Sequence, residues 1–152
     1  MKKVMKLYFD GASKLNGSVN QIAGCGWYAE SEKGNYGGFK FIGHATNNEA
    51  EYQGLINGLR SITNKDQEIE VYGDSMLVIQ QMQKKWQIKA QNLLPLWEEA
   101  QELIKEFKKV YFFHIDRELN SRADTMANNA IKFNSLVKPS HELVRNYSFL
   151  LE

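Results

Sequence analysis

Apolar residues gather in three short runs in the first third of the chain. The runs cover residues 3–9, 23–29 and 38–43, and polar or glycine-containing turns separate them. The segment at residues 31–35 is typical of a hairpin turn between two strands. Strands joined by short turns pair with their neighbours in opposite directions, so the pattern predicts a three-stranded antiparallel meander.

The period of the pattern changes at residue 46. Thr46 and Glu49 have the spacing of a capping box, and apolar residues then recur at helical spacing up to Ile62. The later pattern predicts a strand at residues 68–74, a second helix directly after it, a third helix at 93–108, a strand at 110–115 and a last helix at 121–132. We predict no firm element after residue 134.

This order of elements predicts an α/β fold. A helix that connects two strands of one sheet usually makes a right-handed crossover between parallel strands. We therefore expect a mixed five-stranded sheet flanked by helices, in which strands one to three are antiparallel and strands four and five run parallel to strand one. We expect one domain at residues 1–134 and a C-terminal tail at residues 135–152 that packs on this domain or extends from it.

The composition is that of a soluble globular protein, with 43% hydrophobic and 24% charged residues among 152. The net charge is +1, so contact with nucleic acid depends on a local basic patch. Cys25 is the single cysteine, which excludes an internal disulfide and a cysteine-pair metal site. The apolar run before Asp10 is too short for a signal peptide, so we expect a soluble intracellular protein, cytoplasmic in a prokaryote.

Acidic residues stand where predicted strands end. Asp10 follows the first strand, and we interpret Gly11–Ala12–Ser13 as the turn after it, while Asp74 ends the fourth strand. The carboxyl ends of neighbouring parallel strands share one edge of a sheet, so Asp10 and Asp74 meet if strands one and four are neighbours. Close carboxylates repel each other unless one is protonated or a cation lies between them, and oxygen ligands favour Mg²⁺ or Mn²⁺.

Glu51 and Asp124 also lie at the edges of predicted elements. Two ions held about 4 Å apart by such acids could activate water for phosphodiester cleavage. One acid alone is often only a solvated strand end or a partner of a helix dipole, so the interpretation rests on the set. Periodicity does not decide between Glu49 and Glu51, because neither lies clearly closer to the apolar stripe of the helix.

Four segments, in this order, resemble the type-one branch of the ribonuclease H family. They read Tyr-Phe-Asp-Gly-Ala-Ser at residues 8–13, Thr-Asn-Asn-Glu-Ala-Glu-Tyr at 46–52, Tyr-Gly-Asp-Ser at 72–75 and Arg-Glu-Leu-Asn-Ser-Arg-Ala-Asp-Thr-Met-Ala-Asn at 117–128. The resemblance implies a ribonuclease H-like fold and an endonuclease that hydrolyses the RNA strand of RNA–DNA hybrids to 5′-phosphate and 3′-hydroxyl ends. It also implies two Mg²⁺ ions, with Mn²⁺ as a substitute, held by Asp10, Glu51, Asp74 and Asp124. Glu49 then becomes a capping residue or an exposed acid.

The resemblance also implies substrate contacts next to the acids. Asn47 and Asn48 carry amides that can donate to or accept from a 2′-hydroxyl, and in similar proteins this pair contacts the minor groove of the hybrid. Thr46 matches a position that helps to hold a DNA phosphate. A helix-capping role of these residues is compatible with both contacts. Further candidates for substrate binding are Gly11, Ser13, Asn16 and Ser75.

A basic connector follows the second helix and carries Lys84, Lys85, Trp86 and Lys89. Its lysines could neutralise phosphates, and its tryptophan could pack on a deoxyribose, as resembling enzymes do in the DNA-strand channel. The alternative is an ordinary solvated helix end with one buried indole. The sequence leaves both interpretations open.

The loop at residues 116–120 departs from the family pattern, because it is short and lacks a Gly-His-x-Gly-like segment. Glu118 is our candidate for the proton-handling or metal-releasing role of the missing histidine. His114 falls inside the predicted fifth strand, and we interpret it as structural.

Two other classes of function stay open. One is another nuclease or recombinase on the same fold, such as a DNA junction resolvase, although such proteins would lack the Asn-Asn-x-x-Glu helix start. The other is a module that binds hybrids without cutting them, although acids without metal would repel phosphates. We expect a monomer whose partner is an RNA–DNA hybrid, with no obligate protein partner and no membrane contact.

Overall fold

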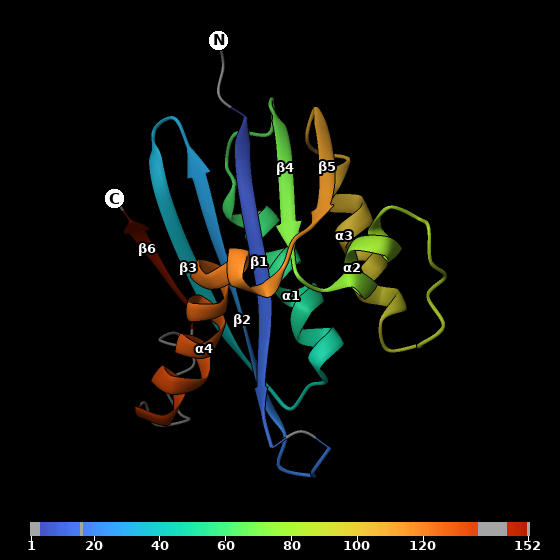
Figure 1. Ribbon diagram of the computed structural model, residues 1–152, viewed down its shortest axis with the longest axis vertical. Helices are drawn as coiled ribbons and strands as arrows, with labels where there is room; N and C mark the ends of the chain where they lie inside the picture. Colours follow the sequence, from blue (N-terminus) through green and yellow to red (C-terminus); the bar gives the residue numbers. More distant parts are fainter. Residues whose placement is uncertain (1–3, 16, 137–145, 152) are drawn as a thin grey trace.

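One β-sheet forms the centre of the computed structural model, which describes residues 4–15, 17–136 and 146–151 (Figure 1). The sheet has six strands in the order β5-β4-β1-β2-β3-β6. The strands are β1 (Met5–Lys14), β2 (Ile22–Ser31), β3 (Gly34–Gly43), β4 (Glu68–Gly73), β5 (Lys109–His114) and β6 (Asn146–Leu151). The helices are α1 (Asn47–Ser61), α2 (Met76–Met82), α3 (Leu94–Ile104) and α4 (Ser121–Leu136), with a short 3₁₀ helix, η1 (Arg117–Asn120), before α4.

The directions of the first five strands confirm the predicted mixed sheet. β1, β2 and β3 pair antiparallel in sequence order, whereas β4 runs parallel to β1 and β5 runs parallel to β4. β6 pairs antiparallel with β3, in the tail where the sequence predicts no firm element. Its partner lies more than a hundred residues earlier in the chain, and local periodicity does not reveal such a long-range pairing. The division between domain and tail at residue 134 stays a prediction.

Helices cover both faces of the sheet. In Figure 1, α1 lies behind the sheet and α4 lies in front of it, while α2 and α3 are seen to the right of β5. On the first face, Leu7 and Phe9 of β1 pack with Leu55 and Leu59 of α1, and all four are fully buried. On the second face, α4 packs over Phe39 of β3. Burial of each such side chain stabilises the fold by roughly 1.5–3 kcal/mol, which fixes the helices that carry the site.

The ends of the helices follow local hydrogen bonding. α1 begins with the predicted capping box, in which Thr46 accepts from the Glu49 N–H and the Glu49 carboxylate accepts from the Thr46 N–H. α3 ends at Ile104, earlier than predicted, because the N–H groups of Glu106 and Phe107 bond to carbonyls three residues back and tighten the chain into a turn. Within the described ranges, no helix has the length and apolar character needed to cross a membrane.

Candidate active site

Asp10 lies inside β1, not at its end as the sequence suggests. The parallel ladder between β1 and β4 stops at the pair Phe9–Gly73, but β1 stays paired with β2, and Asp10 lies opposite Gly26. The predicted turn at residues 11–13 is therefore wrong, because pairing with β2 keeps these residues extended. β1 thus carries Asp10, which is only 4% exposed, past the end of β4.

Two glycines allow α1 to approach β1 closely. A Cβ added to Gly11 would lie 2.6 Å from the backbone nitrogen of Glu51 and 2.7 Å from the carbonyl carbon of Ala50. Gly54 has the matching relation on the helix, since an added Cβ would lie 2.6 Å from the carbonyl oxygen of Asp10. Because no side chain fits at either position, the first turns of α1 rest on the strand and Glu51 lies beside Asp10.

Three carboxylates converge at the end of β4. Asp74 follows β4 directly, and Ser75 caps α2 by accepting the N–H of Val78. Asp10, Glu51 and Asp74 each offer one oxygen, and these oxygens all lie within 4.8 Å of one another. The structure therefore brings together three of the four predicted acids, from β1, α1 and the junction of β4 with α2.

Without a cation, the ionised forms of these carboxyl groups are disfavoured. Burial, followed by the negative charges of Glu51 and Asp74, raises the pKa of Asp10 to about 10. Burial and the charge of Asp74 also raise the pKa of Glu51, to about 8. The Oε2 atom of Glu51 is buried and has no hydrogen-bond partner. Three clustered carboxyl groups, with one buried oxygen that has no partner, fit a divalent cation that prefers oxygen ligands, such as Mg²⁺ or Mn²⁺.

Asp124 lies in the first turn of α4, and its side chain interacts with that of Asp10, which contributes to the raised pKa of Asp10. The Nη2 atom of Arg117 lies 3.9 Å from Oδ1 of Asp124. The charge of Arg117 also lowers the pKa of Asp74, against the larger effect of burial, which raises it. The guanidinium group of Arg117 therefore interacts with two of the acids. The sequence does not predict this interaction, because an arginine in a short polar loop is common.

Asn120 attaches η1 to β1, and its role is not visible in the sequence. The residue is 1% exposed, and its Nδ2 donates to the carbonyl oxygen of Phe9 at 2.9 Å. The segment before Asp124 is thereby tied to the residue before Asp10. In the sequence, the only indication of a role for Asn120 is its position four residues before Asp124. The burial of its amide follows from the fold and cannot be predicted from the sequence.

The polar candidates near the acids lie on the solvent side of the site. The Ser13 hydroxyl is hydrogen-bonded to the side chain of Asn47, which links β1 to the start of α1. Asn48 is exposed in the first turn of the same helix, and Thr46 is its N-cap. Asn16 lies outside the described residues.

Residues 83–93 connect α2 to α3 without regular secondary structure. Lys84, Lys85 and Lys89 are exposed there, and Trp86 is 49% exposed. The alternative interpretation with a buried indole is therefore wrong. An aromatic side chain and three cations are available on this segment.

The two remaining candidates are His114, just before the loop at residues 116–120, and Glu118, within it. His114 ends β5, and its Nε2 lies 3.3 Å from the backbone carbonyl oxygen of Asp74. This contact with the backbone supports the structural interpretation of His114. Glu118 is exposed on η1 and is not one of the three clustered acids.

Comparison with known proteins relates the chain to a family. The family model described as reverse transcriptase-like matches residues 9–130. Over 123 residues the chain is 36% identical to a bifunctional protein of Mycobacterium tuberculosis, a match that covers 80% of this chain and 34% of the relative. The chain thus spans about a third of the length of the first curated relatives that it matches.

Solved structures share both the fold and a substantial part of the sequence. RNase H1 from the archaeon Halobacterium salinarum has a TM-score of 0.78 and 36% identity, covering 86% of this chain and 99% of that chain. LC11-RNase H1, solved in complex with an RNA/DNA hybrid, has a TM-score of 0.75 and 33% identity, covering 88% and 99%. The sheet with its acids at the end of β4 thus defines a ribonuclease H-like fold. The chain belongs to the ribonuclease H family, and the solved structures that it resembles place it with type 1.

Proposed function

We propose that this chain is a metal-dependent endonuclease that hydrolyses the RNA strand of RNA–DNA hybrids, leaving 5′-phosphate and 3′-hydroxyl ends. The observation that supports this most is the cluster of three carboxylates with an unpaired buried oxygen, in a member of the ribonuclease H family. A relative of the same fold, LC11-RNase H1, has been solved with an RNA/DNA hybrid. We propose that the chain acts on its substrate as an intracellular monomer.

Asp10, Glu51, Asp74 and Asp124 are the residues that we assign to two Mg²⁺ ions, for which Mn²⁺ can substitute. Such ions, when bound, supply positive charge at the scissile phosphate and lower the pKa of coordinated water. The contribution of the chain is placement, since the acids stand on a central strand and on helices packed against it. Carboxylates held in this way need little rearrangement during the reaction.

Asn47 and Asn48 are the groups that we assign to recognition of the RNA strand. Both lie at the exposed start of α1, close in sequence to Glu51, and their amides can donate to or accept from 2′-hydroxyls. Lys84, Lys85 and Trp86 are assigned to the DNA strand, through phosphate neutralisation and packing on a sugar. Smaller contacts with the nucleic-acid backbone are assigned to Gly11, Ser13, Asn16, Thr46 and Ser75.

The reaction adds a water oxygen to phosphorus and breaks the bond between phosphorus and the 3′ oxygen. The 3′ oxygen must receive a proton as it leaves. Glu118 is exposed on η1, in the segment that leads to Asp124, and we assign it to this proton transfer or to release of the product. Arg117 on the same turn holds positive charge beside Asp124.

A cleavage assay on labelled substrates tests the proposed function. The wild-type chain with Mg²⁺ should cut an RNA–DNA hybrid and leave a DNA duplex and a four-way DNA junction intact. Asp10→Asn and Asp74→Asn should each lower the rate on the order of 1,000-fold, because each removes an anionic ligand from the site. Asp66→Asn is the matched control, since Asp66 is exposed in the turn before β4.

Hybrid left uncut by the wild-type chain, or cut at an undiminished rate by Asp10→Asn, would refute the proposal. Cleavage of junctions alone would favour a resolvase. Hybrid binding without uptake of Mg²⁺ or Mn²⁺ in calorimetry would favour a module that does not cut.

A further inference from the structure

The end of α2 has a backbone geometry that fixes where the basic connector begins. Lys84 adopts a φ of 63°, in the left-handed region that is unfavourable for lysine. Its N–H bonds to the carbonyl of Gln81 at 3.0 Å, and the N–H of Lys85 bonds to the carbonyl of Gln80 at 2.9 Å. These two bonds form a Schellman motif, in which glycine usually takes the left-handed position. Non-glycine residues hold such a conformation when surrounding contacts determine it.

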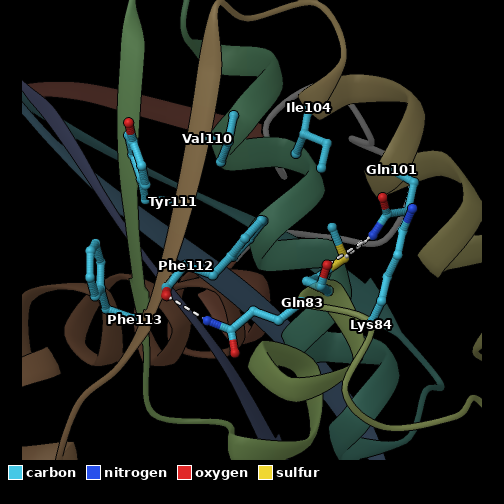
Figure 2. Close-up of a pocket in the computed structure, with 9 residues that line it drawn as sticks. Gln83, Lys84, Gln101, Ile104, Val110, Tyr111, Phe112 and Phe113 are labelled. Carbon is cyan, nitrogen blue, oxygen red and sulfur yellow. Dashed lines mark hydrogen bonds between the residues drawn. The ribbon is translucent and has the colours of Figure 1, made fainter.

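Two side chains of α3 and a backbone carbonyl of β5 supply these surrounding contacts. Trp97 and Gln101 of α3 donate to the last carbonyls of α2, at 3.0 Å and 3.1 Å. Figure 2 shows Gln83 reaching the carbonyl oxygen of Phe112 in β5, at 2.8 Å, in a cavity of about 430 Å³. The amides of Gln83 and Gln101 that line this cavity are already hydrogen-bonded within the protein, so we assign no ligand to it. They hold the end of α2 in place.

Gln81 extends this arrangement into the middle of the connector. The residue is 3% exposed, and its Oε1 accepts a hydrogen bond from the buried hydroxyl of Tyr52 in α1 at 2.6 Å. Its Nε2 donates to the carbonyl oxygen of Gln87 at 3.4 Å. Gln87 directly follows Trp86, which is half-exposed. One buried amide thus connects the helix that carries Glu51 to the backbone of the residue after the exposed Trp86.

We propose that Gln81 is a positioning residue for hybrid binding, acting through the connector and not on the reacting atoms. The inference rests on the proposed function, in which Lys84, Lys85 and Trp86 contact the DNA strand. A connector that is held before binding loses less conformational freedom when the hybrid docks, and its lysines meet the phosphates in one geometry. The simpler alternative is that Gln81 only satisfies the buried hydroxyl of Tyr52.

Comparison of Gln81→Met with Tyr52→Phe separates these two roles. Methionine keeps the length of the side chain and its helix propensity but removes both hydrogen bonds of the amide. We expect the KM for hybrid to rise about three- to tenfold, the scale of one lost hydrogen bond, with kcat changed less than twofold. The salt dependence of hybrid binding should become shallower, because the lysines are no longer held against phosphates. Hydrogen exchange of residues 83–92 should accelerate.

Tyr52→Phe is the matched control, because it removes the other hydrogen bond of the same amide and leaves the link to Gln87. It should lower the free energy of unfolding but leave KM, salt dependence and connector exchange at wild-type values. A rise in KM as large as that of Gln81→Met would show a merely structural role and overturn the proposal. Gln81→Asn, whose amide is one methylene too short to reach Gln87, takes the place of Gln81→Met if that protein does not fold.

A double-mutant cycle with Trp86→Ala tests whether Gln81 acts through the connector. The effect of Gln81→Met on KM should be smaller in the Trp86→Ala background, because the part of it that acts through Trp86 is already lost while the lysines remain. An undiminished effect in that background, or no effect of Gln81→Met on KM at all, would overturn the proposal. Absence of hybrid cleavage by the wild-type chain would instead refute the proposed function, and hydrogen exchange of the connector would still test the link from Gln81.

Discussion

Asp10 shows how much the site requires of a single side chain. Its carboxyl group is 4% exposed and stands next to Glu51 and Asp74, and its pKa is raised to about 10. A carboxyl group with a raised folded-state pKa binds its proton more tightly in the folded chain than in the unfolded chain. Ionisation therefore weakens folding, increasingly as the pH rises from the unfolded pKa towards the folded pKa. At neutral pH without metal, Asp10 is a destabilising residue, and its presence is explained by function.

We expect Asp10→Asn to raise the free energy of unfolding of the metal-free chain at pH 7 by roughly 1–3 kcal/mol. The amide keeps the shape of the side chain and has no ionised form, so folding no longer has to bury or protonate a carboxylate beside the other acids. Urea unfolding in the presence of a chelator measures the effect, with Asp66→Asn as the exposed control. Mg²⁺ should then stabilise the wild type more than the variant, since a ligand stabilises the state that binds it. A variant less stable than wild type in chelator would contradict the repulsion argument.

The choice between Glu49 and Glu51 marks the limit of sequence periodicity at this scale. The spacing of Thr46 and Glu49 is enough to predict the capping box that is observed. The side-chain pattern alone does not show whether Glu49 or Glu51 faces the strand. The difference arises from the close approach at Gly11, which places the backbone of Glu51 against β1. Such an approach between distant segments has no local signature.

Among the elements, β1 shows how a distant partner overrides local sequence. Gly11–Ala12–Ser13 has the composition of a turn, and it follows Asp10, the polar residue that ends the apolar run. β2 nevertheless supplies pairing partners for these residues, so β1 continues to Lys14. The strand and its antiparallel pairing with β2 could be predicted from the sequence, whereas the end of the strand depended on how far that pairing extends, which periodicity does not show. The same reason explains why β6 was not expected.

The 3₁₀ helix η1 provides a prediction at the scale of elements. Asn120→Ala removes the one side-chain bond from η1 to the carbonyl of Phe9 and leaves that buried oxygen without this donor. We expect the free energy of unfolding to fall by about 1–3 kcal/mol. Hybrid cleavage should fall further than the loss of folded protein explains, because η1 leads directly into Asp124.

Urea unfolding and single-turnover cleavage on the same samples check both effects. Asn57→Ala is the matched control, since the amide of Asn57 bonds only within α1 in the described contacts. Asn57→Ala should change the free energy of unfolding only slightly and should leave the cleavage rate unchanged. Equal cleavage rates per folded molecule for Asn120→Ala and wild type would show that η1 keeps its place without this bond.

At the scale of the whole molecule, the acids are gathered from both layers around one sheet. Asp10 comes from the central strand, Glu51 and Asp74 belong to the side of α1 and α2, and Asp124 belongs to α4 on the opposite face (Figure 1). The order of elements was enough to predict a mixed sheet of five strands and their directions, but it left open whether β4 lies beside β1. The 4.8 Å separation within the cluster depends on packing between layers. β6 takes no part in it, because β2 and β3 lie between β6 and β1.

Because β2 and β3 lie between β6 and β1, we predict that β6 contributes to the stability of the fold but not to catalysis. Neighbouring residues of a strand point their N–H groups to opposite sides, so proline at only one of positions 148 and 149 removes a ladder bond to β3. We therefore expect one of Ser148→Pro and Phe149→Pro to lower Tm by a few degrees, on the order of 1 kcal/mol, and the other to stay closer to wild type. Below the lower Tm, both variants should cut hybrid at the wild-type rate. A folded variant with reduced cleavage would show that the edge of β3 is coupled to the acids across two strands, and two unchanged Tm values would show that the pairing of β6 adds nothing to stability.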